Sequence, residues 1–286
     1  DAGHEVCGVF TRRDKLVGRK QILTAPPVKQ LAVEHCLSVY QPRTLRDGSS
    51  DELIKELAPD IIVVVAYGCI IPPQLLHVAK YGCINLHVSL LPKYRGAAPI
   101  NWAVLNGDAV TGVTIMYMAK ELDAGDIISA AETPIDPDEN ALTLTNRLAE
   151  LGAETLSRTV QALNDGTAGR TRQDESAVTF APMLSRELSP MDFTRPARSL
   201  HDQVRGLQPW PCAVTELSGA TVKVYRTAVG GAVKAAPGTI VRADKTGIEI
   251  ACGDGLTLRI LELQPQNGKR MAVASYLAGH PVQVTV

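Results

Sequence analysis

The chain is poor in aromatic residues, since Phe, Trp and Tyr make up only 4% of its 286 residues. Proteins that grip single-stranded nucleic acid by base stacking rely on such rings, so a general RNA-binding protein of that kind is disfavoured. The sequence also lacks an apolar run long enough to span a bilayer and a visible signal peptide. We therefore expect a soluble protein that works in the cytoplasm without a membrane partner.

Spacings that hold metals or nucleotides are missing as well. None of the six cysteines forms a C-x-x-C pair, and there is no H-x-x-x-H or H-E-x-x-H spacing, so we expect no metal site. Neither G-x-G-x-x-G nor G-x-x-x-x-G-K-[ST] occurs, which disfavours a nucleotide cofactor. Most of the cysteines lie in apolar runs, and this predicts buried free thiols in a reducing compartment.

An excess of charge of one sign is also lacking, because the formal net charge is −1. Residues 209–286 nevertheless hold 8 Lys and Arg against 5 Asp and Glu. This modest basic bias is compatible with a polyanionic partner, but many neutral enzymes show as much. The bias alone therefore identifies no partner.

What is present up to about residue 166 is an alternation of β and α patterns. Residues 61–67, IIVVVAY, are apolar on both faces, which is typical of a central parallel strand covered by helices, and residues 82–89 form a second such strand. A long amphipathic helix is predicted over 140–166. The alternation predicts an open, doubly wound, mostly parallel sheet of the Rossmann-like type. Residues 12–27 show neither period and are predicted to form a basic loop, and Pro27 at its end is predicted to open a helix.

The pattern changes in the second half of the chain. Residues 167–195 lose periodicity, and one more helix is predicted at 197–207. From about Pro209 the sequence consists of short β runs cut by glycine, which predicts a small β-barrel or sandwich. We therefore expect an α/β domain at 1–166, a linker and helix at 167–208, and a C-terminal β-barrel at 209–286.

Candidate catalytic residues lie at the end of the strand over 82–89. Asn85 and His87 are two residues apart, so both side chains leave the same face of the strand. In α/β sheets ligands bind beyond the carboxyl ends of the strands. An amide and an imidazole in this place can stabilise an oxyanion and move a proton near neutral pH. Asp123, in the turn ELDAGD, is either a carboxylate that orients the imidazole or simply a turn residue.

Several strings resemble the formyltransferases that use 10-formyltetrahydrofolate. They are INLHVSLLPKYRGAAPINWAVLNGD (84–108), TGVTIMYM and LDAGDI, joined in order along most of the chain by GVFT, APPVKQLA, VVVAYGCIIP, QDESAVTFAPMLS, QPWPCAVT and LQPQNGKRM. Within this family the resemblance is greatest to the members that act on initiator methionyl-tRNA in translation initiation. It implies an enzyme that is a monomer, takes 10-formyltetrahydrofolate as co-substrate, needs no metal and has an OB-like second domain.

The resemblance also implies roles for individual residues. The family's catalytic trio corresponds to Asn85, His87 and Asp123. Its tetrahydrofolate-binding segment corresponds to Ser89, Leu90, Leu91 and Pro92, and the apolar wall of its pteridine pocket to Ala66, Tyr67, Gly68, Ile70 and Ile71. Its tRNA contacts correspond to Arg19 and the adjacent Lys20 in the basic loop, and the C-terminal domain adds the basic pair Lys269 and Arg270.

The sequence departs from the family in two places, and three alternatives stay open. The family's first strand and its Gly-Thr-Pro turn are absent, so the expected sheet lacks a central member, and the basic loop lacks a Pro and a Gly of the family pattern. The first alternative is a relative that formylates glycinamide ribonucleotide or a sugar nucleotide, or hydrolyses formyl-folate. The others are a folate- or nucleotide-binding module without catalysis and a general RNA-binding protein. The second domain and the basic loop favour tRNA.

Overall fold

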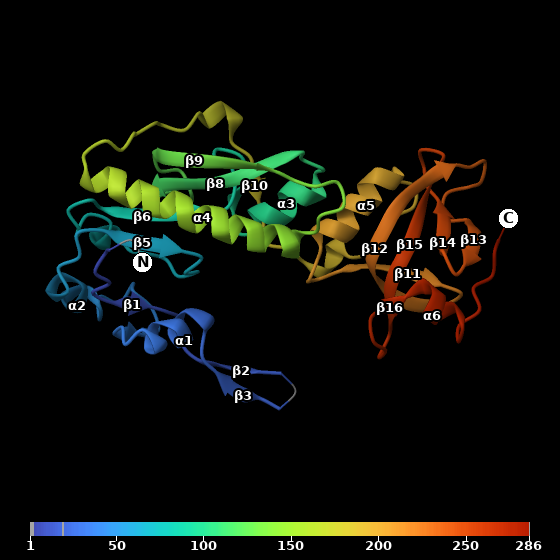
Figure 1. The fold of residues 1–286 in the computed structure, drawn as a ribbon, viewed down its shortest axis with the longest axis horizontal. Coiled ribbons are helices and arrows are strands. Elements are labelled where there is room, and N and C mark those ends of the chain that lie inside the picture. Colours follow the sequence, from blue (N-terminus) through green and yellow to red (C-terminus); the bar gives the residue numbers. More distant parts are fainter. Residues whose placement is uncertain (1–2, 19, 286) are drawn as a thin grey trace. The chain divides into compact units, whose positions relative to one another are not determined.

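The computed structural model of the protein describes residues 3–18 and 20–285 (Figure 1). The chain forms two compact units. One contains the described residues up to His87 together with Val113–Ala131 and Gly152–Glu175. The other contains Val88–Gly112, Glu132–Leu151 and the described residues from Ser176 onward. Each unit is therefore assembled from segments that are far apart in the sequence.

The N-terminal part of the first unit holds two small strand pairs. β1 (Val9–Phe10) and β4 (Val39–Tyr40) are parallel, and the chain between them includes α1 (Pro27–Glu34), which starts at a proline as predicted. β2 (Lys15–Val17) and β3 (Ile22–Thr24) form an antiparallel hairpin. The prediction of an irregular loop here was wrong, because three-residue strands that are exposed on both faces show no alternation of polar and apolar residues.

The main sheet lies mostly in this unit and has the strand order β5-β6-β8-β9. Its members are β5 (Ile62–Val65), β6 (Cys83–His87), β8 (Val110–Tyr117) and β9 (Ile127–Pro134). β5 and β6 are parallel, whereas β6 and β8 are antiparallel. Short helices flank β5 in sequence, namely α2 (Asp51–Glu56) and the 3-10 turn η1 (Pro73–Leu75). The predicted parallel α/β core is therefore present.

The prediction that β5 is buried on both faces was wrong. Val63 is 40% exposed and Val65 is 50% exposed. In the described part of the chain β5 ends the sheet, with β6 as its neighbour. A run of valines shows which side chains are apolar, but it does not show what packs against them.

Helix α4 (Ala141–Asn164) follows the predicted range, and its part from Gly152 onward lies beside the main sheet (Figure 1). Its Gly152 belongs to the first unit and packs against Leu86 of β6. A Cβ atom at Gly152 would lie 2.8 Å from Leu86 Cδ1, closer than such atoms approach in proteins. A side chain at position 152 would force Leu86 to shift, so glycine lets α4 lie close to the strand that carries Asn85 and His87.

The second unit contains a six-stranded antiparallel sheet with the order β11-β12-β15-β14-β13, in which β16 also pairs with β15. The strands are β11 (Ala213–Leu217), β12 (Ala220–Ala232), β13 (Ile240–Asp244), β14 (Gly247–Ala251), β15 (Leu256–Pro265) and β16 (Met271–Ala272). Its core is apolar and includes Leu217, Val224, Ile248 and Ile260. The predicted C-terminal β structure is therefore present.

Shorter elements complete the two units. They are the parallel pair β7 (Arg95–Gly96) and β10 (Phe180–Ala181), the helices α3 (Pro99–Leu105), α5 (Ala197–Gly206) and α6 (Val273–Leu277), and the 3-10 turns η2 (Glu175–Ala177) and η3 (Arg186–Leu188). Within the described residues, no helix combines the length and the apolar character that crossing a bilayer requires.

The cysteines are free thiols, but only half of them are buried. Cys83, Cys212 and Cys252 are buried, and burial raises the pKa of Cys83 to about 12. Cys7 and Cys36 are exposed, so the prediction of buried thiols was wrong for these two. Both lie outside regular elements, one before β1 and the other just after α1, where an apolar neighbourhood in sequence does not ensure burial.

A buried polar network in the second unit joins α5 to the loop before α4. Arg205 and Asp202 form an ion pair at 2.6 Å with both side chains almost fully buried. His201 is 3% exposed, and its Nε2 donates to the Pro137 carbonyl oxygen at 3.1 Å. Because a carbonyl only accepts, Nε2 carries the hydrogen, and Nδ1 accepts from the Thr227 hydroxyl at 2.9 Å. These contacts suit a neutral imidazole, which burial also favours by lowering the pKa of His201.

We expect the free energy of unfolding to decrease as the pH falls below 6.5, the ordinary pKa of histidine, because burial lowers the pKa of His201. The unfolded chain then takes up a proton that the folded chain resists, so this stability is present above pH 6.5 and is lost toward the lower folded pKa. Between about pH 7.5 and about pH 5.5 the loss should reach at most about 1.4 kcal/mol. Denaturant unfolding of the parent and of His201→Gln measures it. Equal pH slopes in the two proteins would contradict the assignment.

Candidate active site

Strand β6 places the two predicted polar side chains at the end of a buried strand. Asn85 lies opposite Met116 of β8, and His87 lies opposite Thr114. His87 is 6% exposed, whereas Asn85 is partly buried. The residues between and before them on β6 are apolar and buried, which anchors the strand in the sheet. The sheet therefore holds the amide and the imidazole at a fixed spacing along one strand.

The fold brings Asp123 to His87, although 36 positions separate them in the sequence. Asp123 Oδ2 lies 3.7 Å from His87 Nδ1, and the carboxylate is only 12% exposed. This distance is within ion-pair range and longer than a hydrogen bond. Contacts of this kind often shorten when the substrate binds. The ring nitrogen that faces the carboxylate is therefore Nδ1.

The loop that carries Asp123 connects β8 to β9 and has a constrained backbone. Asp123 has a φ of 50°, in the left-handed region. A Cβ atom at Gly125 would lie 1.7 Å from the Tyr117 carbonyl oxygen, so only glycine fits there. The Gln173 side-chain amide donates to the carbonyl oxygens of Asp123 and Gly125, at 2.8 Å each. The loop thus has its shape set by close packing and by a buried amide.

Residues 170–173 run beside both ends of this loop. Arg170 pairs with Asp126 at 2.7 Å, and its guanidinium lies 4.7 Å from the centre of the Tyr117 ring. Thr171 and Ile127 exchange two backbone hydrogen bonds, at 2.7 and 2.8 Å. No site residue was predicted in this segment, so Gln173 was missed. The only signal for it was its place in the string QDESAVTFAPMLS.

The predicted pteridine wall forms the turn after β5 in the first unit. Tyr67 and Ile71 pack against the buried cluster of Leu45, Ile54 and Leu75, whereas Ile70 is 63% exposed. Arg12 donates through Nε to the Tyr67 carbonyl oxygen at 3.1 Å and through Nη2 to that of Gly68. Ala66, at the start of the turn, has a φ of 46°. The turn is therefore anchored on one side and presents an apolar side chain on the other.

The predicted tetrahydrofolate segment, Ser89–Pro92, follows β6 in sequence and belongs to the second unit. Ser89 is fully buried, and its hydroxyl donates to the Lys93 carbonyl oxygen at 2.6 Å. Leu91 is 8% exposed and precedes a cis peptide bond to Pro92, whereas Leu90 and Pro92 are partly buried. This segment is thus a turn held by its own serine.

The residues predicted to contact tRNA are on the surface where the structure describes them. Lys20 is exposed in the turn of the β2–β3 hairpin, and Arg19 lies outside the described residues. Lys269 is exposed just before β16. Arg270 pairs with Glu262 and lies 4.7 Å from the centre of the Tyr225 ring, so part of its charge is compensated. The second unit therefore displays the predicted basic pair.

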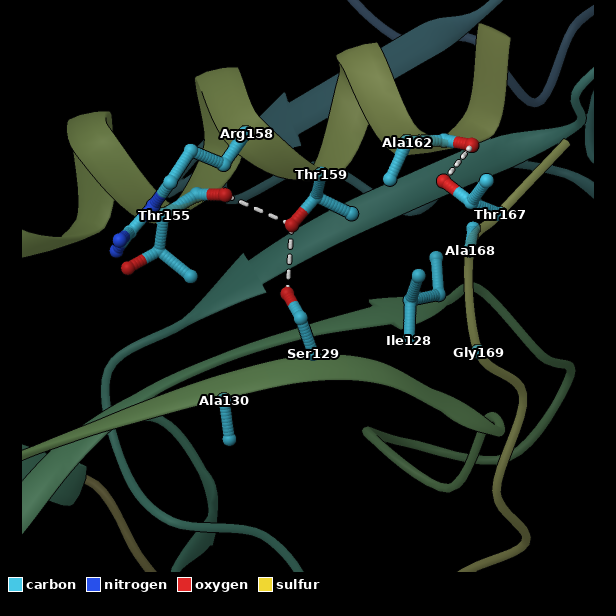
Figure 2. Close-up of a pocket in the computed structure, with 10 residues that line it drawn as sticks. All are labelled: Ile128, Ser129, Ala130, Thr155, Arg158, Thr159, Ala162, Thr167, Ala168 and Gly169. Carbon is cyan, nitrogen blue, oxygen red and sulfur yellow. Dashed lines mark hydrogen bonds between the residues drawn. The ribbon is translucent and has the colours of Figure 1, made fainter. Parts of the chain in front are cut away.

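An open cavity of about 370 Å³ lies between α4 and β9 in the first unit (Figure 2). Ten residues line it, and the predicted catalytic trio is not among them. Thr159 donates to the Thr155 carbonyl oxygen at 2.7 Å, so Ser129 must be the donor in the 2.6 Å bond between the Ser129 and Thr159 hydroxyls. Both hydroxyl hydrogens are therefore used within the wall of the cavity, and the cavity is separate from the candidate site.

Asn85, His87 and Asp123 together offer a defined chemistry. The amide and the imidazole can donate hydrogen bonds to a developing oxyanion, and the imidazole can also transfer a proton. The carboxylate can fix the tautomer and orientation of the ring. Among the described residues, no group of three or more His, Cys, Asp or Glu is placed to hold a metal ion.

Comparison with known proteins gives matches to both halves of the chain. Residues 1–160 match the family model described as formyl transferase, and residues 183–281 match the formyl transferase C-terminal domain. The structure of HypX from Aquifex aeolicus in complex with tetrahydrofolic acid is similar in fold, with a TM-score of 0.64 and 18% identity, over 94% of this chain and 46% of that one.

Two curated relatives are similar along almost the whole chain. The methionyl-tRNA formyltransferase of Trichlorobacter lovleyi is 46% identical over 282 residues, which cover 99% of this chain and 89% of that protein. The methionyl-tRNA formyltransferase of Geobacter sulfurreducens is 48% identical over 279 residues, which cover 98% of this chain and 87% of that protein. The chain therefore belongs to the formyl transferase family, and its full-length similarity places it with the methionyl-tRNA formyltransferases.

Proposed function

We propose that this chain transfers a formyl group from 10-formyltetrahydrofolate to the α-amino group of initiator methionyl-tRNA at a site made by Asn85, His87 and Asp123. The observation that carries the proposal is the approach of Asp123 Oδ2 to His87 Nδ1, 3.7 Å away, with Asn85 two residues before His87 on β6. Three polar side chains without a common role would have no reason to lie together at the end of a buried strand.

In the proposed reaction the amine nitrogen of the methionyl group bonds to the formyl carbon. The electrons of the carbonyl double bond move to its oxygen, and the amide of Asn85 with the imidazole of His87 stabilises that negative charge. The carbonyl double bond then re-forms, and the bond between the carbon and N10 of the folate breaks. The proton lost by the amine is moved to the leaving nitrogen, with His87 as carrier and Asp123 as the group that orients it.

For the folate we propose two protein segments. The turn Ala66–Ile71 presents the exposed apolar side chain of Ile70 and is anchored by Tyr67, Ile71 and the two hydrogen bonds from Arg12. A flat heterocycle with hydrogen-bonding edges suits such a turn, because apolar contact and backbone groups are both at hand. Ser89–Pro92 is the second segment, assigned from its sequence.

For the tRNA we propose the basic residues of both parts of the chain, Arg19 and Lys20 in the hairpin and Lys269 and Arg270 in the β structure. In this view 1–166 is the catalytic domain, 167–208 a linker and helix, and 209–286 an OB-like β-barrel that holds the tRNA. Bulges in the 13-residue strand β12 are compatible with the curling of such a barrel. We propose that the protein acts as a cytoplasmic monomer.

A panel of acceptors tests the proposal. The chain is incubated with 10-formyltetrahydrofolate labelled in the formyl group and with methionyl-tRNA, glycinamide ribonucleotide, a 4-amino sugar nucleotide or water alone. We expect label on methionyl-tRNA only, and none on the matched control N-acetylmethionyl-tRNA, which has no free α-amino group. Label on either small acceptor, or release of formate in water at a similar rate, would overturn the proposal in favour of that activity.

A further inference from the structure

The position of Asp123 depends on the loop between β8 and β9, which has a constrained backbone. Asp123 has left-handed backbone geometry, and two residues later Gly125 packs against the Tyr117 carbonyl with no room for a side chain. A residue in this conformation keeps it only when the surrounding structure determines it. The contacts that hold the loop backbone therefore decide where the carboxylate points.

Gln173 supplies two such contacts from a distant part of the chain. Its side chain is 4% exposed, and its Nε2 lies 2.8 Å from both the Asp123 and the Gly125 carbonyl oxygens. A primary amide nitrogen carries two hydrogens, so this geometry uses both of them. The same nitrogen lies 4.0 Å from Met116 Sδ on β8, which places the amide against the sheet as well as the loop.

The main chain just before Gln173 is itself fixed. Thr171 exchanges two backbone hydrogen bonds with Ile127 at the start of β9. Gln173 therefore extends from a segment that is tied to the sheet and reaches the one loop that carries Asp123. The amide of a glutamine can donate twice to neighbouring carbonyls without a charge, whereas an ionised glutamate in the same place would only accept.

We propose that Gln173 is a positioning residue for formyl transfer, which sets the backbone at Asp123 so that the carboxylate faces His87 Nδ1. The proposal rests on the function proposed above for Asn85, His87 and Asp123. A misplacement of a catalytic group by about 1 Å can cost up to about 100-fold in rate. Gln173 acts on the Asp123 carboxylate only through the backbone of the loop, so the effect of its loss should be smaller. We therefore expect its loss to lower kcat by about tenfold, with the KM for methionyl-tRNA unchanged.

The test is a double-mutant cycle of Gln173→Leu and Asp123→Asn, with kcat and both KM values measured on folded protein. Gln173→Leu alone should lower kcat about tenfold, and in the Asp123→Asn background it should lower kcat no further, because both act through one carboxylate. Gln173→Glu, which keeps the size of the side chain but donates no hydrogen bond, should behave like Gln173→Leu. Gln161→Leu is the matched control, since that glutamine donates to Asp165 on the surface of α4 and should retain full kcat.

The outcomes separate the two proposals. If Asp123→Asn loses kcat while Gln173→Leu and Gln173→Glu keep it, the catalytic trio stands and the positioning role is overturned. Losses that multiply in the double mutant also overturn it, because Gln173 would then act independently of Asp123. If Asp123→Asn itself keeps kcat, the proposed function of the trio fails, and the role of Gln173 fails with it. A lower melting temperature with unchanged kcat shows a structural role only.

Discussion

Replacing His87 with alanine is expected to lower the kcat for formyl transfer by about 10² or more, the usual cost of losing an oxyanion donor or an acid–base group. His87 is the side chain that links the other two, since it follows Asn85 on β6 and faces Asp123 at 3.7 Å. The loss should fall on kcat and not on folate affinity, because the interaction forms only as the charge develops on the formyl oxygen. Single-turnover kinetics with saturating folate measure it directly.

Asn85→Ala should have an effect of similar size, and the two losses should not multiply, because both residues serve one oxyanion. The matched control is His77→Ala, since His77 is exposed after the η1 turn and belongs to no part of the site. A melting curve like that of the parent would show that the altered proteins are folded. A folded His87→Ala protein that binds folate and turns over at nearly the parent rate would show that the proposed mechanism is wrong.

Local patterns in the sequence correctly predicted the elements that have a clear period or a clear starting residue. The long helix predicted at 140–166 is α4, Ala141–Asn164, and the predicted start at Pro27 is the start of α1. The β runs after Pro209 became a six-stranded antiparallel sheet. These elements are set by period and by residue type, both of which can be counted along the chain.

Packing was harder to predict, because it depends on partners that are distant in the sequence. The valines of β5 indicated a strand correctly, but Val63 and Val65 are half exposed. The hairpin over residues 15–24 was missed for the same reason, since its leucines and valines are exposed and carry no buried face. Hydrophobic residue type alone does not tell an edge strand from a central one.

The residues of the candidate site also divide into those that a local sequence pattern predicts and those that only the folded chain brings together. The spacing of Asn85 and His87 is local, so one strand was enough to pair them. Asp123 was found in a turn motif, and neither periodicity nor spacing showed that it approaches His87; the family resemblance implied it. Gln173 lies 50 residues after Asp123 and donates to two backbone carbonyl oxygens of that loop. Because a backbone contact leaves no trace in the sequence of the partner, such a residue is visible only in the folded chain.

The affinity for methionyl-tRNA is expected to fall on the order of 50-fold when the salt concentration rises from about 50 mM to about 200 mM. We expect one phosphate contact from each of four residues, Arg19, Lys20, Lys269 and Arg270. Counterion release then gives a slope of about −3 for the logarithm of the binding constant against the logarithm of the salt concentration. Net charge plays little part, because the whole chain carries only −1. Filter binding of labelled tRNA over this range of salt measures the slope.

Single charge removals show which residues carry this dependence. Lys269→Ala and Arg19→Ala should each make the slope less steep by about 1 and should weaken tRNA binding while folate binding stays intact. Lys55→Ala is the charge-matched control, because Lys55 is a surface lysine of α2 paired with Glu52 at 2.8 Å, and it should leave the slope unchanged. An enzyme whose acceptor is a small molecule would bind tRNA weakly and with the same slope in all of these proteins. That result would remove the basic residues from the tRNA site, whereas a slope that changes with Lys269 and Arg19 but not with Lys55 locates the tRNA on both parts of the chain.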